Sequence, residues 1–299
     1  MEITPEVRKE LAERRPVVAL ETTLVTHGFA YPANLEIARR MTWAISEEGA
    51  TAASIGIVNG QARVGLSDTD LARLAHDDGA RKVSRRDLPL VLAQGANGGT
   101  TVAATSILAH RAGIGVFATG GIGGVHRGHP EDISADLPTL ATTPIVVVCA
   151  GAKAILDLPR TLEYLETRGV PVIGYRTDEF PAFYSRHSGL PVDARVDSPD
   201  EVAVMVQTRA ALGLDAALLV CVPCPEEDEL PAEALETSIV EAVTEANAKG
   251  ITGRNVTPFL LARLVEMTAG QSQRANEALL VNNARVAARI AVAVANLDR

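Results

Sequence analysis

The segment Ile145-Val146-Val147-Val148-Cys149-Ala150-Gly151-Ala152-Lys153 decides the fold. Its first part, 145–149, is an apolar and largely β-branched run of strand length, which is typical of a strand buried on both faces. Strands of this kind belong to largely parallel sheets that helices cover. Lys153 should therefore emerge at the carboxyl end of a sheet strand, where open α/β sheets bind their ligands.

Further short apolar runs alternate with helical segments along the chain. Strands are predicted at 16–20, 114–118, 171–175 and 216–222, and helices near 231–249, 258–267 and 273–296 fill the last third. We expect an α/β protein, a three-layer α/β/α sandwich with a central mixed, largely parallel sheet and a helical C-terminal third. No repeat, low-complexity tract or composition shift marks a linker, so residues 1–299 are predicted to form a single domain.

Local turn and cap signals predict where several elements begin and end. Asn59-Gly60 separates two apolar stretches, and it predicts a hairpin with a type I′ turn because both residues tolerate positive φ angles. Asn34, Ser67 and Ser198 each precede a helical segment and are predicted to be its N-cap.

The composition argues against several classes of protein. The formal net charge of −9 argues against a nucleic-acid or anionic-membrane binder, since phosphate contacts need a basic surface. We find no apolar stretch of membrane-spanning length, and the start Met1-Glu2-Ile3-Thr4-Pro5 lacks a basic-then-apolar signal sequence, so we expect a cytoplasmic protein. The segment Cys221-Val222-Pro223-Cys224 has redox-motif spacing, but no second pair completes a zinc site, which favours two small apolar side chains.

Lysine is scarce in this chain. Of 28 Lys and Arg residues only four are lysines, so arginine serves almost wherever a positive charge is enough. A partly desolvated amine at Lys153 could attack a carbonyl. The alternative is a lysine on the first turn of a helix that reaches into solvent, and position alone does not separate the two.

The glycine-rich segment 118–128 follows a predicted strand. Four glycines within 120–124 let backbone amides approach and surround an anion. The segment is not a dinucleotide fingerprint, because His126 stands at the third glycine position, and it lacks the Gly-Lys-Ser/Thr ending of a P-loop. Thr119, His126 and Arg127 add donors, which favours a phosphate or sugar-phosphate site over a plain connection between strands.

Carboxylates and cations lie at other element boundaries. Glu21 follows the strand 16–20, where it could have a raised pKa and act as a general acid, or could simply cap or pair. Asp132 lies close after the glycine-rich segment and suits a hard divalent cation, although by spacing alone a helix N-cap at Asp132 or Ser134 is the better explanation. The run Lys82-Val83-Ser84-Arg85-Arg86-Asp87 is by itself typical of a solvated charged face.

Together these segments resemble the pseudouridine-5′-phosphate glycosidase family from about Pro16 to the C-terminus. The matching stretches are Leu20–Asn34, Lys82–Leu92, Gly98–Gly128, Asp132–Leu137, Val148–Asp157 with Thr161–Thr167, and Phe180–Gly189. The resemblance implies an enzyme that reversibly cleaves the C–C glycosidic bond of pseudouridine 5′-phosphate to uracil and ribose 5-phosphate, in pseudouridine breakdown. It also implies one Mn²⁺ per subunit, a homotrimer, and small molecules rather than nucleic acid as partners.

The resemblance assigns roles residue by residue. By motif, Lys153 corresponds to the nucleophile, Glu21 to the proton donor and Asp132 to the metal ligand. Residues that correspond to substrate contacts are Lys82, Val102, Ser134, Ala135 and Asp136, with Thr119, His126 and either Asn282 or Asn283 as further members. Two segments depart from the family pattern: the loop between Gly128 and Asp132 is shorter, and Cys221–Pro225 replaces an Asn-Pro-Ile-Pro-like stretch.

The chemistry of a C-glycoside agrees with this residue set. Ordinary glycosidases protonate a leaving oxygen, which a C-glycoside lacks. An amine that attacks the anomeric carbon and opens the ring can form a Schiff base, and Glu21 would then protonate the departing uracil carbon. Arginine could not replace Lys153, because a guanidinium stays protonated. Three alternatives stay open: a relative that forms C–N bonds in pigment biosynthesis, another Schiff-base sugar-phosphate lyase or aldolase, and a non-catalytic phosphosugar-binding protein.

Overall fold

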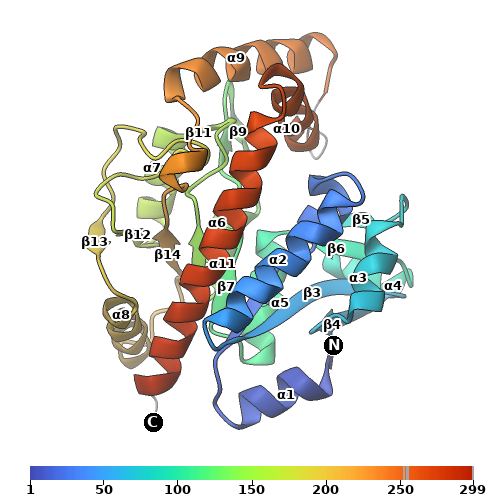
Figure 1. Ribbon diagram of the computed structural model, residues 1–299, viewed down its shortest axis with the longest axis vertical. Coiled ribbons are helices and arrows are strands. Elements are labelled where there is room, and N and C mark those ends of the chain that lie inside the picture. Colours follow the sequence, from blue (N-terminus) through green and yellow to red (C-terminus); the bar gives the residue numbers. More distant parts are fainter. Residues whose placement is uncertain (252, 254–255, 298–299) are drawn as a thin grey trace.

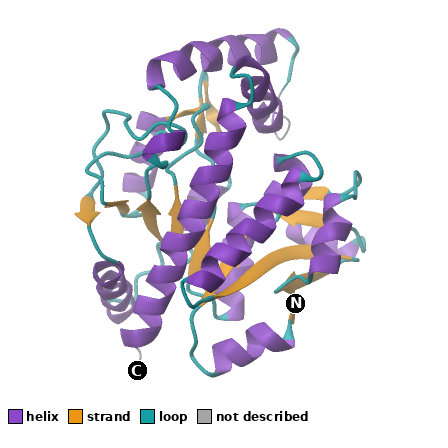
Figure 2. Cartoon of the chain, viewed as in Figure 1, coloured by secondary structure: helices purple, strands orange, loops and turns teal. Residues whose placement is uncertain are grey.

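A mixed sheet forms the centre of the protein (Figures 1 and 2). The computed structural model describes residues 1–251, 253 and 256–297. Across the sheet the strands follow the order β1 (Glu2–Ile3), β4 (Gln61–Val64), β3 (Thr51–Val58), β2 (Val17–Leu20), β7 (Val116–Ala118), β10 (Val146–Cys149), β14 (Leu218–Cys221), β12 (Val172–Tyr175) and β13 (Ala194–Val196). β5 (Arg81–Val83) and β6 (Gly98–Thr100) lie off this path, where β6 pairs with both β3 and β5.

Each pair of adjacent strands along the path β3, β2, β7, β10, β14, β12 and β13 is parallel. Within this sheet, β4 and β6 both pair antiparallel with β3. The prediction of a mixed, largely parallel sheet is therefore confirmed. Because β2, β7 and β10 are adjacent and parallel, the residues that follow these three strands meet at one edge of the sheet.

Helices cover the sheet. The helices are α1 (Pro5–Ala12), α2 (Ala33–Glu47), α3 (Asp68–Ala75), α4 (Leu88–Ala93), α5 (Val102–Ala112), α6 (Asp136–Leu140), α7 (Leu158–Thr167), α8 (Pro199–Ala211), α9 (Ala232–Ala248), α10 (Val256–Met267) and α11 (Gln271–Leu297). Figure 1 shows α11 crossing one face of the sheet beside α2, and α11 also packs on α8, β7 and β10. α9 and α10 lie together at the end of the molecule opposite to α1 and the last turns of α11 (Figure 1). The predicted helical C-terminal third is confirmed.

A second, three-stranded sheet escaped the sequence analysis. It consists of β9 (His129–Ile133), β8 (Val125–His126) and β11 (Leu156–Asp157), paired antiparallel with β8 in the middle. These strands are short, and β9 contains a proline, so none shows the apolar alternation that predicts a strand. The small sheet holds His126 and Asp132 beside the segment that follows Lys153.

The predicted hairpin and two of the three predicted caps are confirmed. Asn59 and Gly60 have φ angles of 52° and 69°, as the turn between β3 and β4 requires. Ser67 and Ser198 each form a capping box at the start of α3 and α8. The Asn34 prediction was wrong, because Asn34 lies inside the first turn of α2, where its buried amide donates to the Val25 carbonyl oxygen at 2.8 Å.

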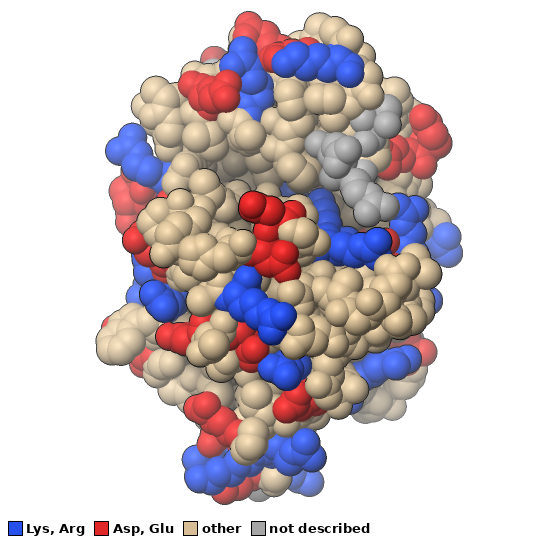
Figure 3. All heavy atoms as spheres, turned by 90° about the vertical axis from the view of Figure 1, so that its right-hand side faces the viewer, with Lys and Arg blue, Asp and Glu red and all other residues tan. Residues whose placement is uncertain are grey.

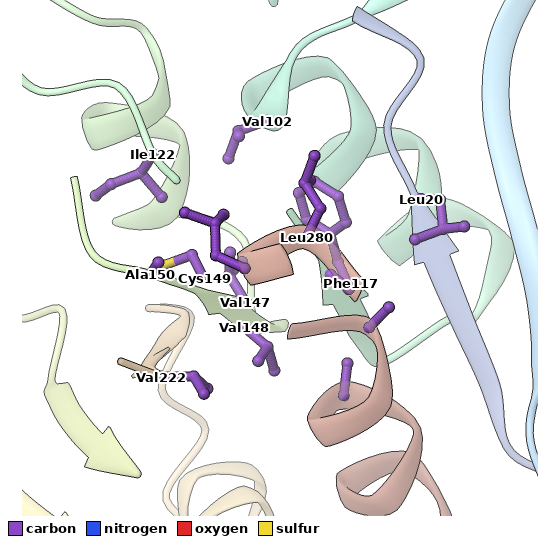
Figure 4. Packing of buried hydrophobic residues seen from close by; sticks show 14 of the residues in the cluster. Leu20, Val102, Phe117, Ile122, Val147, Val148, Cys149, Ala150, Val222 and Leu280 are labelled. Carbon is purple, nitrogen blue, oxygen red and sulfur yellow. The ribbon is translucent and has the colours of Figure 1, made fainter. Parts of the chain in front are cut away.

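α11 forms a central part of the core. By length and composition it could cross a membrane, contrary to our expectation from the sequence, but 56% of its apolar window is buried inside the protein. Leu280 of α11 packs with Phe117 of β7 and Val147 and Val148 of β10 in the apolar cluster drawn in Figure 4. α11 is therefore a core helix that covers one face of the sheet. All three cysteines are free and buried in the core, which agrees with the interpretation of Cys221 and Cys224 as two small apolar side chains.

Candidate active site

A cavity of about 670 Å³ opens at the carboxyl ends of β2 and β10. Its lining brings together Glu21, Thr23, Lys82, Ser84, Arg85, Arg86, Asp87, Thr101, Val102, Gly123, His126, Asp132, Ile133, Ser134, Ala135, Asp136, Lys153, Leu156, Gly253 and Thr257. Nine residues predicted from the sequence, including Lys153, Glu21 and Asp132, therefore share one cavity. Figure 3 shows a hollow on the face that carries β5 and α4, with Lys and Arg side chains along one side of it.

A larger cavity, of about 810 Å³, lies between α9 and the segment 154–159. Its lining is mainly apolar, and its charged groups include Arg127 and Glu236, which form an ion pair with each other. Its described lining contains carboxylates but no lysine amine, and its arginine is already paired with Glu236. We therefore assign the chemistry to the 670 Å³ cavity.

Backbone bonds to the glycine-rich segment hold Lys153 in place. The Ala150 amide donates to the Gly120 carbonyl oxygen at 2.8 Å, and the Lys153 amide donates to the Ile122 carbonyl oxygen at 3.1 Å. Gly151 between them has a φ angle of 80°, and a Cβ there would come within 2.1 Å of the Pro181 carbonyl oxygen. Only glycine fits this position, which brings the half-buried Lys153 side chain to the cavity.

Glu21 extends from the end of β2 toward the same point. The Thr119 hydroxyl, at the end of β7, donates a short hydrogen bond to Glu21 Oε1. Burial raises the pKa of Glu21 above its usual value, and the charge of Asp136 adds to this, whereas Lys153, Thr119 and Lys82 oppose it. A carboxyl group in this position is suited to hold a proton and to donate it inside the cavity.

Asp136 connects two walls of the cavity. Its buried carboxylate accepts from the Ala103 amide at 2.9 Å and from the Gly123 amide at 2.8 Å. One oxygen thus holds the start of α5, and the other holds the glycine-rich segment. Asp136 begins α6, and the Ser134 hydroxyl accepts from its amide at 3.2 Å. The prediction of an N-cap at Asp132 or Ser134 was wrong, because the N-cap of α6 is Ala135, whose side chain cannot accept a hydrogen bond.

Cationic groups line another part of the cavity. Lys82, at the carboxyl half of β5, is half-buried, and the exposed Arg85 and Arg86 follow it. The first turn of α5 lies nearby, with Thr101 as its N-cap and Val102 as its first residue. A helix N-terminus and a set of cations together suit an anionic group such as a phosphate. The interpretation of 82–87 as only a solvated run is therefore incomplete.

His126 and Asp132 reach the cavity from the small sheet. Burial lowers the pKa of His126, and Asp132 opposes this with its negative charge. Among the described residues, no group of three or more His, Cys, Asp or Glu side chains is arranged to hold a metal ion. Asp132 is half-buried and accepts no hydrogen bond from the part of the chain that the structure describes, so its oxygens suit a hard cation that keeps most of its water.

Neither Asn282 nor Asn283 lines the 670 Å³ cavity or the side recess that adjoins it. Asn283 is buried and donates to the Thr119 carbonyl oxygen at 2.8 Å, and Asn282 donates to the Pro223 carbonyl oxygen at 3.4 Å. Asn276, which the sequence did not lead us to predict, lines this side recess. It lies two helical turns before Asn283 on the same face of α11, so the periodicity of this helix could have pointed to it.

A side recess adjoins the main cavity. The two share Glu21, Thr23, Lys82, Lys153 and Thr257. The rest of the recess is lined by Leu24, His27, Gly28, Phe29, Thr119, Gly120, Gly121, Phe183, Pro258, Leu261, Asn276 and Leu280. The amine and the acid therefore lie where a cationic cavity and a more apolar recess meet.

Residues 6–293 match the family described as indigoidine synthase A like protein. The chain belongs to this family. Relatives named pseudouridine-5′-phosphate glycosidase include those of Methylobacterium nodulans, 56% identical over 296 residues, and Caldanaerobacter subterraneus subsp. tengcongensis, 54% identical over 294 residues. Each alignment covers 98% of this chain, and 88% and 96% of the two relatives respectively. The predicted family resemblance and the prediction that this family member is an enzyme are confirmed.

Two solved structures share the fold of this indigoidine synthase A-like chain. The prealnumycin C-glycosynthase AlnA, in complex with ribulose 5-phosphate, is 40% identical, with a TM-score of 0.92 over 99% of this chain and 97% of that one. An indigoidine synthase A-like protein from Thermotoga maritima is also 40% identical, with a TM-score of 0.91 over 100% of this chain and 96% of that one.

Proposed function

We propose that this chain reversibly cleaves the C–C glycosidic bond of pseudouridine 5′-phosphate to uracil and ribose 5-phosphate. The observation that carries the proposal is the meeting of the Lys153 amine and the half-buried Glu21 carboxyl where the cationic cavity joins the apolar recess. The names of relatives at 54–56% identity support the same reaction. In this proposal the phosphate lies near Lys82 and the start of α5, and the base lies in the recess.

The proposed reaction begins at the ribose. The Lys153 nitrogen bonds to C1′ while the bond between C1′ and the ring oxygen breaks, and that oxygen takes a proton to become the 4′-hydroxyl. Glu21 then protonates uracil C5. The nitrogen lone pair forms the imine as the C1′–C5 bond breaks, and the electron pair of that bond restores the C5–C6 double bond of uracil. Water hydrolyses the imine and releases ribose 5-phosphate and the free amine.

A divalent ion such as Mn²⁺ fits the site at Asp132. Hard cations commonly take one or two carboxylates and keep several waters, which agrees with a single half-buried carboxylate on the cavity wall. The bound ion would supply charge and oriented water near the ribose hydroxyls. Asp132 holds its position through β9, whose pairing with β8 also places His126 on the same wall.

Turnover in solution tests the proposal. Wild-type protein with Mn²⁺ should release uracil from pseudouridine 5′-phosphate, as followed by chromatography. Lys153→Arg should lose the activity, because arginine keeps the charge but cannot form the imine. Lys249→Arg, at an exposed position on the end of α9, is the matched control and should keep it. Equal uracil release by wild-type protein and Lys153→Arg would contradict the proposal.

A second candidate is C-glycoside synthesis on another aromatic partner. The similarity to a C-glycosynthase favours it, because the same amine and phosphate site could serve a different acceptor. Supplying uracil with ribose 5-phosphate separates the two candidates. Formation of pseudouridine 5′-phosphate supports the first candidate, and its absence together with an imine on Lys153 supports the second.

We propose further that the chain acts in pseudouridine breakdown in the cytoplasm and that it assembles as a homotrimer. Exposed apolar side chains such as Trp43, Leu212 and Val240 offer surface for contacts between subunits. Light scattering measures the assembly directly. A mass of three chains of 31.5 kDa supports the trimer, and a mass of one or two chains contradicts it.

A further inference from the structure

A π-helical turn that contains His27 follows β2 and Glu21 in the chain. The turn spans Leu24–Gly28, and such turns are rare and occur frequently at functional sites. Thr22 anchors it: its carbonyl oxygen accepts from the Val25 amide at 3.0 Å, and its hydroxyl donates to the Ile55 carbonyl oxygen at 2.7 Å. His27 is thereby held at a fixed position relative to Glu21.

The contact between Thr26 and His27 bears on which nitrogen of His27 carries the proton. The Thr26 hydroxyl lies 2.6 Å from His27 Nδ1 and 3.3 Å from the Thr22 carbonyl oxygen. The one hydrogen of the Thr26 hydroxyl can go either to His27 Nδ1 or to the Thr22 carbonyl oxygen, which also accepts from the Val25 and Thr26 amides. We assign it to Thr22, the arrangement in which both contacts of the hydroxyl are hydrogen bonds. The hydroxyl oxygen therefore accepts from Nδ1–H, which leaves Nε2 as an acceptor. No other described residue bonds to Nε2.

The imidazole is suited to stay neutral. Desolvation by the surrounding recess lowers the pKa of His27 even though part of its side chain is exposed, and the nearby charge of Lys82 lowers it further. A neutral ring protonated on Nδ1 accepts a hydrogen bond at Nε2 and donates none there.

His27 lines the side recess that begins at Glu21 and Lys153. Phe29, Phe183 and Leu280 supply apolar surface in the same recess. Apolar surface with few polar groups is the lining that a planar heterocycle requires, since its faces are apolar and its edge carries N–H and C=O groups. The recess thus has a place for such a ring directly beside the acid that would protonate it.

We propose that His27 recognises the base, and that its Nε2 accepts a hydrogen bond from an imide N–H of the pyrimidine. The proposal rests on the function proposed above and names the residue that selects the base. Thr26 acts as the positioning residue, because its hydroxyl keeps the proton on Nδ1. A ring without an N–H at the contacted position would leave Nε2 unpaired.

Kinetics in the synthetic direction test this proposal. His27→Ala should raise the KM for uracil about tenfold, the usual effect of one lost hydrogen bond to a bound ligand, and should leave the KM for ribose 5-phosphate nearly unchanged. Thr26→Val keeps the shape of the side chain and removes the hydroxyl, so it should raise the KM for uracil in the same direction. An equal change in both KM values, or no change in either, would overturn the proposal.

Methylated bases identify the contact. If N1–H of the base donates to Nε2, wild-type protein should use 1-methyluracil far less well than uracil. If N3–H donates instead, 3-methyluracil should be the poor substrate. In His27→Ala the penalty for that methyl group should shrink, because the acceptor is gone. Unchanged penalties for both methyl groups would overturn the proposal.

Two controls separate this proposal from the one on which it rests. Borohydride trapping of ribose 5-phosphate on Lys153 needs no base, so His27→Ala should form this adduct as the wild type does. If wild-type protein forms no adduct and no product, the proposed function fails, and if only the base dependence is unchanged, the role of His27 fails. Long-range ¹H–¹⁵N spectra read the tautomer, and they should show Nδ1–H in the wild type and a loss of that preference in Thr26→Val.

Discussion

At the scale of single residues, the predicted reacting groups depend on where strands end. Lys153 and Glu21 each follow a buried strand, so the sequence predicted that each lies at a strand's carboxyl end, where ligands bind. That these two strands lie close together was not predictable from the strand patterns. Asn276 was out of reach of this argument, because it extends from the side of a helix. Its position depends on the rotation of α11 over the sheet, which packing sets, and the local signal that could have indicated it is its spacing of two helical turns from Asn283.

Glu21→Gln should remove the acid. We expect kcat to fall by a factor of about 10² to 10⁴ with a smaller change in KM, since the proton is needed only in the transition state. Because the pKa of Glu21 is raised, the wild-type activity that depends on this proton should decline as pH rises through the raised value. The exposed Glu241→Gln is the matched control. A pH profile of the residual activity that matches the wild type would contradict this role.

The same residue makes stability depend on pH. Between the usual value of 4.5 and the raised pKa of Glu21, the folded protein binds more protons than the unfolded chain. The contribution of Glu21 to the free energy of unfolding is therefore full at low pH and is lost as pH rises. Chemical denaturation at several pH values should show this slope in wild type and a shallower one in Glu21→Gln. Equal slopes would contradict the raised pKa.

Asp136→Asn tests the link between α5 and the glycine-rich segment. An amide group can accept from only one of the two backbone N–H groups through its oxygen, so one buried N–H loses its partner. We expect a loss of about 1–3 kcal/mol in the free energy of unfolding. Asp215→Asn, at an exposed position, is the control and should have little effect. Equal stability of the two variants would show that the two bonds are not needed.

At the scale of elements, the hairpin and the Ser-capped helices were predictable because their signals are local. The small sheet was not, because β8, β9 and β11 are held by pairing across segments that are distant in sequence. Its consequence for the site is large, since it carries His126 and Asp132. The capping explanation placed an N-cap at Asp132 or Ser134, whereas the N-cap of α6 is Ala135. It also did not predict that Asp136 accepts from the Ala103 amide, which is distant in the sequence.

Gly151→Ala tests the connection between β10 and Lys153. A Cβ at Gly151 would overlap the Pro181 carbonyl oxygen, and the φ angle of 80° also disfavours alanine. Gly213→Ala is the matched control, because its φ angle is 65° and nothing lies within 4 Å of the added atom. We expect Gly151→Ala to lose about 2 kcal/mol more stability than Gly213→Ala, and to lose activity as Lys153 moves. Similar losses in the two variants would contradict the close contact.

At the scale of the whole molecule, the layers and the largely parallel sheet were predictable from the alternation of apolar strands and helices. The strand order was not, because β7 and β10 lie beside β2 only through the packing of α5, α11 and the intervening chain. The net charge of −9 excluded a basic surface, yet the cavity gathers Lys82, Arg85 and Arg86 locally. A global charge thus says little about one site.

Ribose 5-phosphate should stabilise the folded protein as a whole. At a concentration one hundred times its Kd, binding adds about 2.7 kcal/mol to the free energy of unfolding, which a thermal melt detects. Ribose without the phosphate should stabilise far less, because the cations at Lys82 and the start of α5 would have no anion to bind. Equal stabilisation by the two sugars would contradict the phosphate site.

The most direct test of the central claim is to trap the imine. Incubation with ribose 5-phosphate and borohydride, followed by peptide mass spectrometry, should find the reduced sugar-phosphate adduct on Lys153 and on none of the other three lysines. An adduct elsewhere, or no adduct under conditions in which the protein releases uracil from pseudouridine 5′-phosphate, would contradict the account.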